Sequence, residues 1–271
     1  MLYLVINELT ANTQVTILIL EKNMATNTTI DFEDKNQFDA IAEQWWNPSG
    51  SLKSLHQFTP IRIEYIKNSI RRHHFGEWKK LRPLSNLQIL DIGCGGGLLA
   101  EPMSKLGGIV TGIDSSLSTI EIARQHAETS KLEIDYQVTT AERLADKGTK
   151  FDVIYASEVI EHVSDRSLFL KSIQRLLTPE GVVIITTINR NLFSFALAKI
   201  SAEYIFELIP KGTHDFTKFV KPSELQSEAK EAGIILDDFT GFKPLLDGRF
   251  KFTSITTINY GASGSLSRPN K

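Results

Sequence analysis

The chain has 271 residues and a formal net charge of −2, since 30 Lys and Arg residues nearly balance 32 Asp and Glu residues. This length suits one large domain or two small ones, and the near-neutral charge argues against a nucleic-acid-binding protein, which would carry a basic excess. A single cysteine excludes an internal disulfide framework and is typical of a protein of the reducing cytoplasm.

Residues 1–34 predict a disordered N-terminal extension. Residues 1–23 hold two apolar patches, but they lack the basic residues and the small-residue cleavage site of a secretory signal. Met24 opens a polar stretch typical of a natural start, so we expect translation to begin there and residues 1–23 to have no role. A peripheral membrane tether is the alternative for this segment.

From residue 35 the chain alternates short apolar runs with amphipathic segments, after two segments of helical spacing at 35–46 and 58–74. The predicted strands are 87–93, 109–114, 134–140, 151–158, 181–189, 236–242 and 254–260. The predicted helices between them are 98–106, 115–130 (with Ser115 or Ser116 as N-cap), 164–177 and 222–232. This order predicts one α/β domain over 35–260, with a mainly parallel seven-stranded sheet and helices on both faces. The tail 261–271 is expected to be disordered.

A glycine turn, Asp91-Ile92-Gly93-Cys94-Gly95-Gly96-Gly97, follows the first predicted strand. Ligands of doubly wound sheets bind beyond the carboxyl ends of the strands, where glycines allow close approach of the backbone. The dinucleotide fingerprint GxGxxG would need a glycine at Leu98, which disfavours a nicotinamide dehydrogenase. The pattern DxGxGxG instead resembles the first motif of S-adenosylmethionine-dependent class I methyltransferases.

Two acidic residues follow the next two predicted strands. Asp114 ends the second strand, 21 residues after Gly93, where a carboxylate can accept hydrogen bonds from both ribose hydroxyls. The alternative is a helix N-cap, and together with the glycine turn we favour ribose binding. Glu142 lies just past the third strand, where such methyltransferases place a loop that contacts adenine, although it could equally be a surface charge.

The segment Ser157-Glu158-Val159-Ile160-Glu161-His162-Val163 ends the fourth predicted strand and brings two carboxylates and an imidazole within five residues. These groups could act as acid and base, or as ligands of one divalent ion. The alternative is that Glu158 contacts substrate or water while Glu161 and His162 face solvent.

Several stretches together resemble the ubiquinone-biosynthesis O-methyltransferase family, and the resemblance covers about residues 35–260. They are FDAIAEQWW (38–46), LHQFTPIRIEYI (55–66), LDIGCGGGLLAEPMSKLGGIVTGID (90–114), SEVIEHV (157–163), TINRNLFSF (187–195) and KGTHDFTKFVKPSEL (211–225). The paired tryptophans, NRN and KGTHD are the most discriminating parts. The resemblance implies a Rossmann-like class I methyltransferase fold. It also implies methylation of hydroxyl groups on polyprenylated catechol and quinol intermediates, of the 2-polyprenyl-6-hydroxyphenol and 3-demethylubiquinol type.

The same resemblance implies site residues. The residues expected to bind S-adenosylmethionine are Arg62, Gly93, Gly95, Asp114 and Ser157. A guanidinium at Arg62 suits the methionyl carboxylate, which it can grip with two hydrogen bonds. Family members of the mitochondrial type use a divalent metal, and the matching ligands for Mg²⁺ are Glu158, Glu161 and His162.

The chemistry requires a deprotonated phenol, because a neutral phenol, with a pKa of about 10, is a poor nucleophile. Magnesium on adjacent catechol oxygens would stabilise the phenolate. Alternatively, His162 or a nearby carboxylate takes the proton. The helices before the first strand, with Trp45 and Trp46, are expected either to form a lid that excludes water or to pack against the sheet.

An insertion, residues 190–221, follows the fifth predicted strand and carries an apolar stripe at helical spacing with a basic excess. Such a segment can lie in a lipid interface, so we expect peripheral contact with anionic lipid at the inner face of the cytoplasmic membrane. Packing on the domain and a substrate lid are the alternatives. Lys211, His214 and Asp215 are expected to border the substrate pocket.

Two further functions stay open on the sequence. One is a class I methyltransferase that acts on a soluble small molecule. The other is a membrane-associated scaffold of a ubiquinone-biosynthesis complex that binds the cofactor without turnover. Intact Asp91, Gly93 and Asp114 argue against the scaffold, as does the cluster of Glu158, Glu161 and His162.

Overall fold

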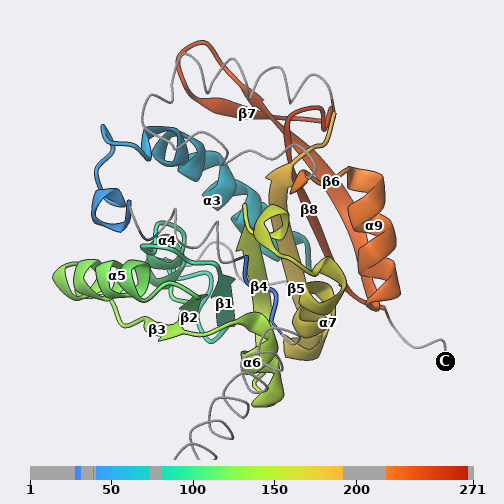
Figure 1. Ribbon diagram of the computed structural model, residues 1–271, viewed down its shortest axis with the longest axis horizontal. Helices are drawn as coiled ribbons and strands as arrows, with labels where there is room; N and C mark the ends of the chain where they lie inside the picture. The colour runs from blue at the N-terminus through green and yellow to red at the C-terminus, as the bar shows by residue number, and fades with distance from the viewer. Residues whose placement is uncertain (1–27, 32–38, 40, 74–80, 192–217, 268–271) are drawn as a thin grey trace, which may run out of the picture.

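The computed structural model describes residues 28–31, 39, 41–73, 81–191 and 218–267, which form one eight-stranded sheet between two layers of helices (Figure 1). The strand order is β3-β2-β1-β4-β5-β8-β6-β7. The strands are β1 (Gln88–Ile92), β2 (Ile109–Asp114), β3 (Asp135–Val138), β4 (Phe151–Ser157), β5 (Leu177–Ile188), β6 (Ile234–Pro244), β7 (Phe250–Thr253) and β8 (Asn259–Leu266). Strands β1 to β5 pair in parallel, and β8 is antiparallel to both β5 and β6. The order therefore reverses between β1 and β4, which is where ligands bind in such sheets.

Helices cover both faces of the sheet. One layer is α3 (Lys53–His73), α4 (Ala100–Lys105) and α5 (Leu117–Thr129), and the other is α6 (Ala141–Asp146), α7 (Arg166–Leu176) and α9 (Pro222–Glu231). Alternate residues of β4 divide between the two cores: Val153 packs with the first layer and Ile154 with the second. A strand buried on both faces needs mostly apolar residues, which explains the short apolar runs in the sequence.

The prediction of a disordered tail at 261–271 is wrong for residues 261–266, which belong to β8 between β5 and β6. The segment is rich in glycine and serine because its neighbours lie close. A Cβ at Gly261 would overlap the ring of Tyr65, and one at Gly264 would overlap the backbone oxygen of Ile235. A composition typical of disorder here reflects close packing.

The strand predicted at 254–260 begins only at Asn259, and residues 254–258 form a loop. Side chains from the end of β5 hold this loop, since the Asn189 amide donates to the carbonyl of Thr256 and the Asn191 amide to that of Thr257. The eighth strand, β7, was not predicted and pairs with β6 as a hairpin.

The N-terminal predictions need two corrections. Residues 28–31, expected within a disordered extension, lie on the domain: Thr29 is buried and Ile30 forms a bridge with Val163. In the described part of the helix predicted at 35–46, Asp39 is helical, Ala42–Gln44 form the 3₁₀ turn η1, and Trp45 and Trp46 lie in a turn after it. In the part of the chain that the structure describes, no helix has the length and apolar character needed to cross a bilayer.

Candidate functional site

The glycine turn after β1 forms the floor of the site. Gly93, Gly95 and Gly97 all have positive φ angles, of 66°, 51° and 92°, which other residues adopt only with strain. A Cβ at Gly95 would also overlap the indole ring of Trp45. The turn therefore requires glycine both for its backbone conformation and for the close approach of a neighbour.

The paired tryptophans lie on this turn. Trp45 is buried against it, and the Trp46 indole donates a hydrogen bond to the carbonyl of Gly96 at 2.9 Å. The ring of Trp46 stacks on His126 with 3.4 Å between ring centroids, and His126 pairs with the buried Glu101. The segment before α3 is thus fixed to the glycine turn and to α5.

Asp114 holds the glycine turn from the end of β2. Its Oδ2 accepts from the backbone N–H of Gly95 at 3.0 Å, and its Oδ1 from that of Ser116 at 2.9 Å. The N-cap of α5 is Ser116, one of the two predicted caps, so the alternative role of Asp114 as N-cap is wrong. Burial raises the pKa of Asp114, and the two backbone donors oppose that rise.

Arg62 enters the site from α3 and is buried. Its Nη1 donates to Ser157 Oγ at 3.1 Å and its Nη2 to Thr59 Oγ1 at 2.8 Å. Among the described residues, its Nε has no hydrogen-bond partner. Burial lowers the pKa of Arg62, while the nearby carboxylates of Glu158 and Asp91 raise it. A buried guanidinium with a spare donor suits a carboxylate ligand.

Glu158 follows β4 in a left-handed conformation, with φ at 57°. Its Oε1 accepts from the Thr186 hydroxyl at 2.8 Å and its Oε2 from the Asn259 amide at 3.2 Å. Burial and the neighbouring Glu161 carboxylate raise the pKa of Glu158 to about 7, although Arg62 opposes this. Strained backbone of this kind persists where the surroundings hold it, often at functional sites.

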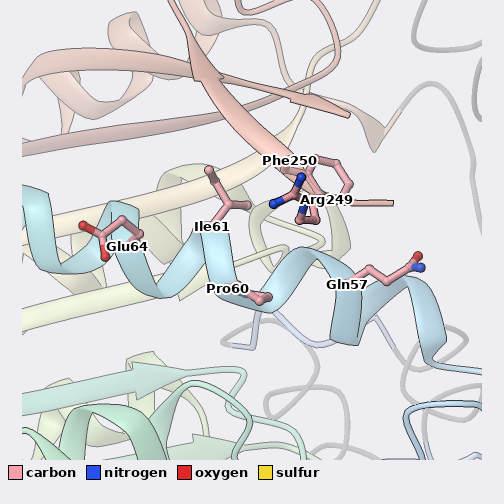
Figure 2. A pocket seen from close by; sticks show the side chains of 6 residues that line it. All are labelled: Gln57, Pro60, Ile61, Glu64, Arg249 and Phe250. Atoms are coloured by element: carbon pink, nitrogen blue, oxygen red, sulfur yellow. The ribbon is translucent and has the colours of Figure 1, made fainter. Parts of the chain in front are cut away.

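A groove elsewhere on α3 holds none of the predicted site residues. It has a volume of about 270 Å³ and lies between α3 and the start of β7. Figure 2 shows Ile61 and Phe250 within it, with Glu64 and Gln57 toward its two ends. Arg62 belongs to the neighbouring face of the helix and bonds to Ser157, so this groove is separate from the glycine turn.

Residues 90–185 match the family described as "Methyltransferase domain". A protein of Chelativorans sp. (strain BNC1) named "Ubiquinone biosynthesis O-methyltransferase" is 45% identical over 238 residues, which is 87% of this chain and 94% of the relative. One of the same name from Pelagibacter ubique (strain HTCC1062) is 47% identical over 232 residues, 85% of this chain and 96% of the relative. The chain belongs to the ubiquinone biosynthesis O-methyltransferase family.

Solved structures agree on the fold of this family member. Magnesium protoporphyrin IX methyltransferase from Synechocystis PCC 6803 with bound SAH has a TM-score of 0.55 at 18% identity, covering 77% of this chain and 83% of that one. An S-adenosylmethionine-dependent methyltransferase from Thermotoga maritima has a TM-score of 0.57 at 18% identity, covering 86% and 99%. The expected Rossmann-like class I methyltransferase fold is confirmed, with β7 added to the seven expected strands.

The residues expected to bind S-adenosylmethionine lie at one edge of the sheet. Gly95 is bonded to Asp114, and Arg62 to Ser157. Backbone N–H groups of the turn, a carboxylate at the end of β2 and a guanidinium with a spare donor suit the polar groups of this cofactor. The sequence did not reveal Thr186 as the partner of Ser157 or Asn259 as the partner of Glu158, because these partners come from distant segments.

The expected magnesium ligands do not fit a metal. Among the described residues, no three His, Cys, Asp or Glu side chains are grouped to hold one. Thr186 binds Glu158, whereas the next residue, Thr187, donates to Glu161 at 2.8 Å. Consecutive strand residues face opposite sides of a sheet, so their hydroxyls draw the two carboxylates apart. His162 is half-buried and follows both glutamates in the chain, at the end of η2 (Ile160–His162).

The raised pKa of Glu158 predicts a pH dependence of stability. Between the usual pKa of 4.5 and about 7, the unfolded chain ionises this carboxyl while the folded chain keeps it protonated. The free energy of unfolding should therefore fall as pH rises through this window, by about 1–3 kcal/mol. Urea unfolding at pH 5 and pH 8 should show this difference, and Glu158→Gln should remove most of it. An equal slope in the variant would contradict the assignment.

Proposed function

We propose that this chain is an S-adenosylmethionine-dependent O-methyltransferase of ubiquinone biosynthesis, acting on hydroxyl groups of polyprenylated catechol or quinol intermediates. The observation that carries the proposal is the bonded pair Arg62–Ser157 beside the Asp114-held glycine turn, in a chain 45% identical to a relative of that name. The cofactor would supply a methyl group on a positively charged sulfur. This methyl group would pass to the substrate oxygen as the carbon–sulfur bond breaks.

Each site residue then has a separate task. Arg62 binds the methionyl carboxylate through its spare donor, and the Asp114 carboxylate binds the ribose hydroxyls. The paired tryptophans cover the glycine turn and exclude water from the reacting atoms. Because its geometry is held by Thr186 and Asn259, Glu158 can keep one orientation toward the acceptor.

Glu158 is the proton acceptor that these contacts support best. A phenol has a pKa of about 10, and a carboxylate whose pKa is raised to about 7 is a stronger base than an ordinary one. His162, which lies four residues after Glu158 at the end of η2, is the second candidate. Both lie past the end of β4, so the assay below compares them directly.

The reaction can be tested with labelled S-adenosylmethionine and a short-chain prenyl catechol, with magnesium and with excess chelator. We expect methylation in both conditions, because the carboxylates of Glu158 and Glu161 are held apart. Glu158→Gln should lower kcat about 100-fold or more, while His162→Gln should lower it less than tenfold. Methylation that needs magnesium would contradict Glu158 as the proton acceptor. Cofactor binding without methylation would mean that the methyl acceptor is another compound.

We also propose that residues 190–221 contact anionic lipid at the inner face of the cytoplasmic membrane. Residues 192–217, with Lys211, His214 and Asp215, lie outside the described part of the chain. Support comes from the apolar stripe and basic excess in the sequence, and from the prenylated acceptor, which resides in lipid. Flotation with anionic liposomes should recover the unaltered chain and lose a Phe193→Asp/Tyr204→Asp variant. Equal recovery of both would remove this proposal.

A further inference from the structure

Residues 28–31, here called the N-terminal strap, lie across the start of α6. The backbone N–H of Thr29 donates to Glu142 Oε1 at 2.7 Å, and the Thr29 hydroxyl lies 3.3 Å from both carboxylate oxygens. Thr29 and Glu142 are 6% and 5% exposed, so these contacts are shielded from water. Glu142 is therefore not the surface charge that the sequence left open.

The strap also binds two other segments. The carbonyl of Thr29 accepts from the backbone N–H of Ser164 at 3.0 Å, and Ile30 bridges Val163 in an antiparallel register. Asp31 pairs with Lys218 at 2.9 Å. Four residues that are more than 100 positions from these segments in sequence thus join the start of α6, the turn after η2 and the segment that leads into α9.

A buried carboxylate is costly unless donors surround it. The strap gives Glu142 a backbone N–H and a hydroxyl, which replace the water that burial removes. Without them, the first turn of α6 would have to move to bring the Glu142 carboxylate to solvent. The position of this turn therefore depends on the strap.

The start of α6 borders the cofactor site. The backbone N–H of Thr139 donates to the carbonyl of Asp114 at 3.0 Å, and α6 begins two residues later, at Ala141. A ligand whose ribose binds Asp114 and whose methionyl end binds Arg62 must place its base beyond β2, next to this turn. The strap also holds the end of a second loop, which leads from Glu158 through η2 to Ser164.

We propose that Thr29 is a positioning residue for the methyl donor: by holding Glu142 and Ser164, it fixes the two loops between which the adenine of S-adenosylmethionine binds. The affinity for S-adenosylmethionine then depends on the N-terminal strap, whereas the affinity for the methyl acceptor does not. The inference rests on the proposed use of S-adenosylmethionine, and it is independent of the acceptor's identity.

The test uses the full chain and S-adenosylhomocysteine binding by calorimetry. Thr29→Pro removes both donors to Glu142 and should raise Kd at least tenfold, and Thr29→Val, which keeps the N–H, should raise it about threefold. Thr29→Ser restores the hydroxyl and should bind as the unaltered chain does. Thr129→Val is the matched control, since that threonine is exposed at the end of α5 and bonds only to Gln125 of its own helix among the described residues.

Two further readouts separate positioning from general loss of structure. In Thr29→Pro, amide hydrogen exchange should speed up at 141–146 and 160–165 and stay unchanged in β1 and β4. The KM for S-adenosylmethionine should rise while the acceptor KM and kcat change less than twofold. Unchanged Kd and exchange, or an equal rise in both KM values, would overturn the proposal. If the unaltered chain fails to bind S-adenosylhomocysteine, both this inference and the proposed function are wrong. If it binds S-adenosylhomocysteine but does not methylate the prenyl catechol, only the proposed methyl acceptor is wrong.

Discussion

Replacing Arg62 with alanine is expected to abolish measurable binding of S-adenosylhomocysteine, a loss of at least about 100-fold. The guanidinium is buried, and it is bonded to Ser157 and Thr59 with its Nε still available to a ligand. A charge-assisted contact with the methionyl carboxylate would be lost, and a factor of 100 corresponds to about 2.7 kcal/mol.

The same change is expected to lower the free energy of unfolding by about 3–5 kcal/mol, because a buried charge would lose its partner. Glu158 and Asp91 both interact with this guanidinium, and both carboxyl groups are desolvated. Urea unfolding measures this loss. Because such a variant can fail to fold, Arg62→Lys is the second test: it keeps the charge but loses the planar fork, and should bind about tenfold more weakly.

Arg71→Ala is the matched control for Arg62, since it removes an exposed guanidinium from the same helix. We expect its affinity and stability to stay within about 0.5 kcal/mol of the unaltered chain. Binding of S-adenosylhomocysteine by a folded Arg62→Ala variant with unchanged Kd would refute the assignment of Arg62 to the methionyl carboxylate.

Replacing Gly95 with alanine is expected to displace Trp45 and to prevent cofactor binding. Gly95 has a φ of 51°, and its added Cβ would overlap the indole of Trp45, which is itself buried. The N–H of Gly95 also donates to Asp114, so a shifted turn would release the carboxylate expected to bind ribose. We expect a loss of stability of about 2–4 kcal/mol and a Kd raised at least 100-fold.

Gly148→Ala separates the effect of backbone strain from the effect of the overlap with Trp45. Gly148 has a φ of 75°, but a Cβ there would meet nothing within 4 Å. This control should therefore show the backbone strain alone, about 1 kcal/mol, with unchanged affinity for S-adenosylhomocysteine. Tryptophan fluorescence should change in Gly95→Ala and not in Gly148→Ala. Equal effects of the two substitutions would mean that Trp45 has no role at the turn.

Local patterns predicted most of the sheet and the centre of the site. Apolar runs marked β1, β2 and β4, because strands covered on both faces are built mostly of apolar residues. The glycine turn was visible because its positive φ angles restrict the residue type directly. Asp114 was found because its distance from the turn follows from the lengths of one helix and one strand.

Other features depended on contacts between distant segments. The serine and glycine residues of β8 resembled a disordered tail, and only the neighbouring Tyr65 explains why small side chains are needed there. Glu158 and Glu161 are three residues apart, and proximity in sequence suggested a shared metal. The hydroxyls of Thr186 and Thr187 face opposite sides of β5. Because each binds one of the two carboxylates, they hold Glu158 and Glu161 apart.

By itself, the sequence determined the α/β class, the family and the residues at the edge of the sheet, because each rests on a short-range pattern of polarity, glycine or motif. Only the tertiary structure decided which partners hold those residues: Ser157 for Arg62, Asn259 for Glu158, and Thr29 for Glu142. These pairs are separated by 95, 101 and 113 positions. Hydrogen bonds of this kind leave no local pattern, since they depend on where folding places two unrelated segments.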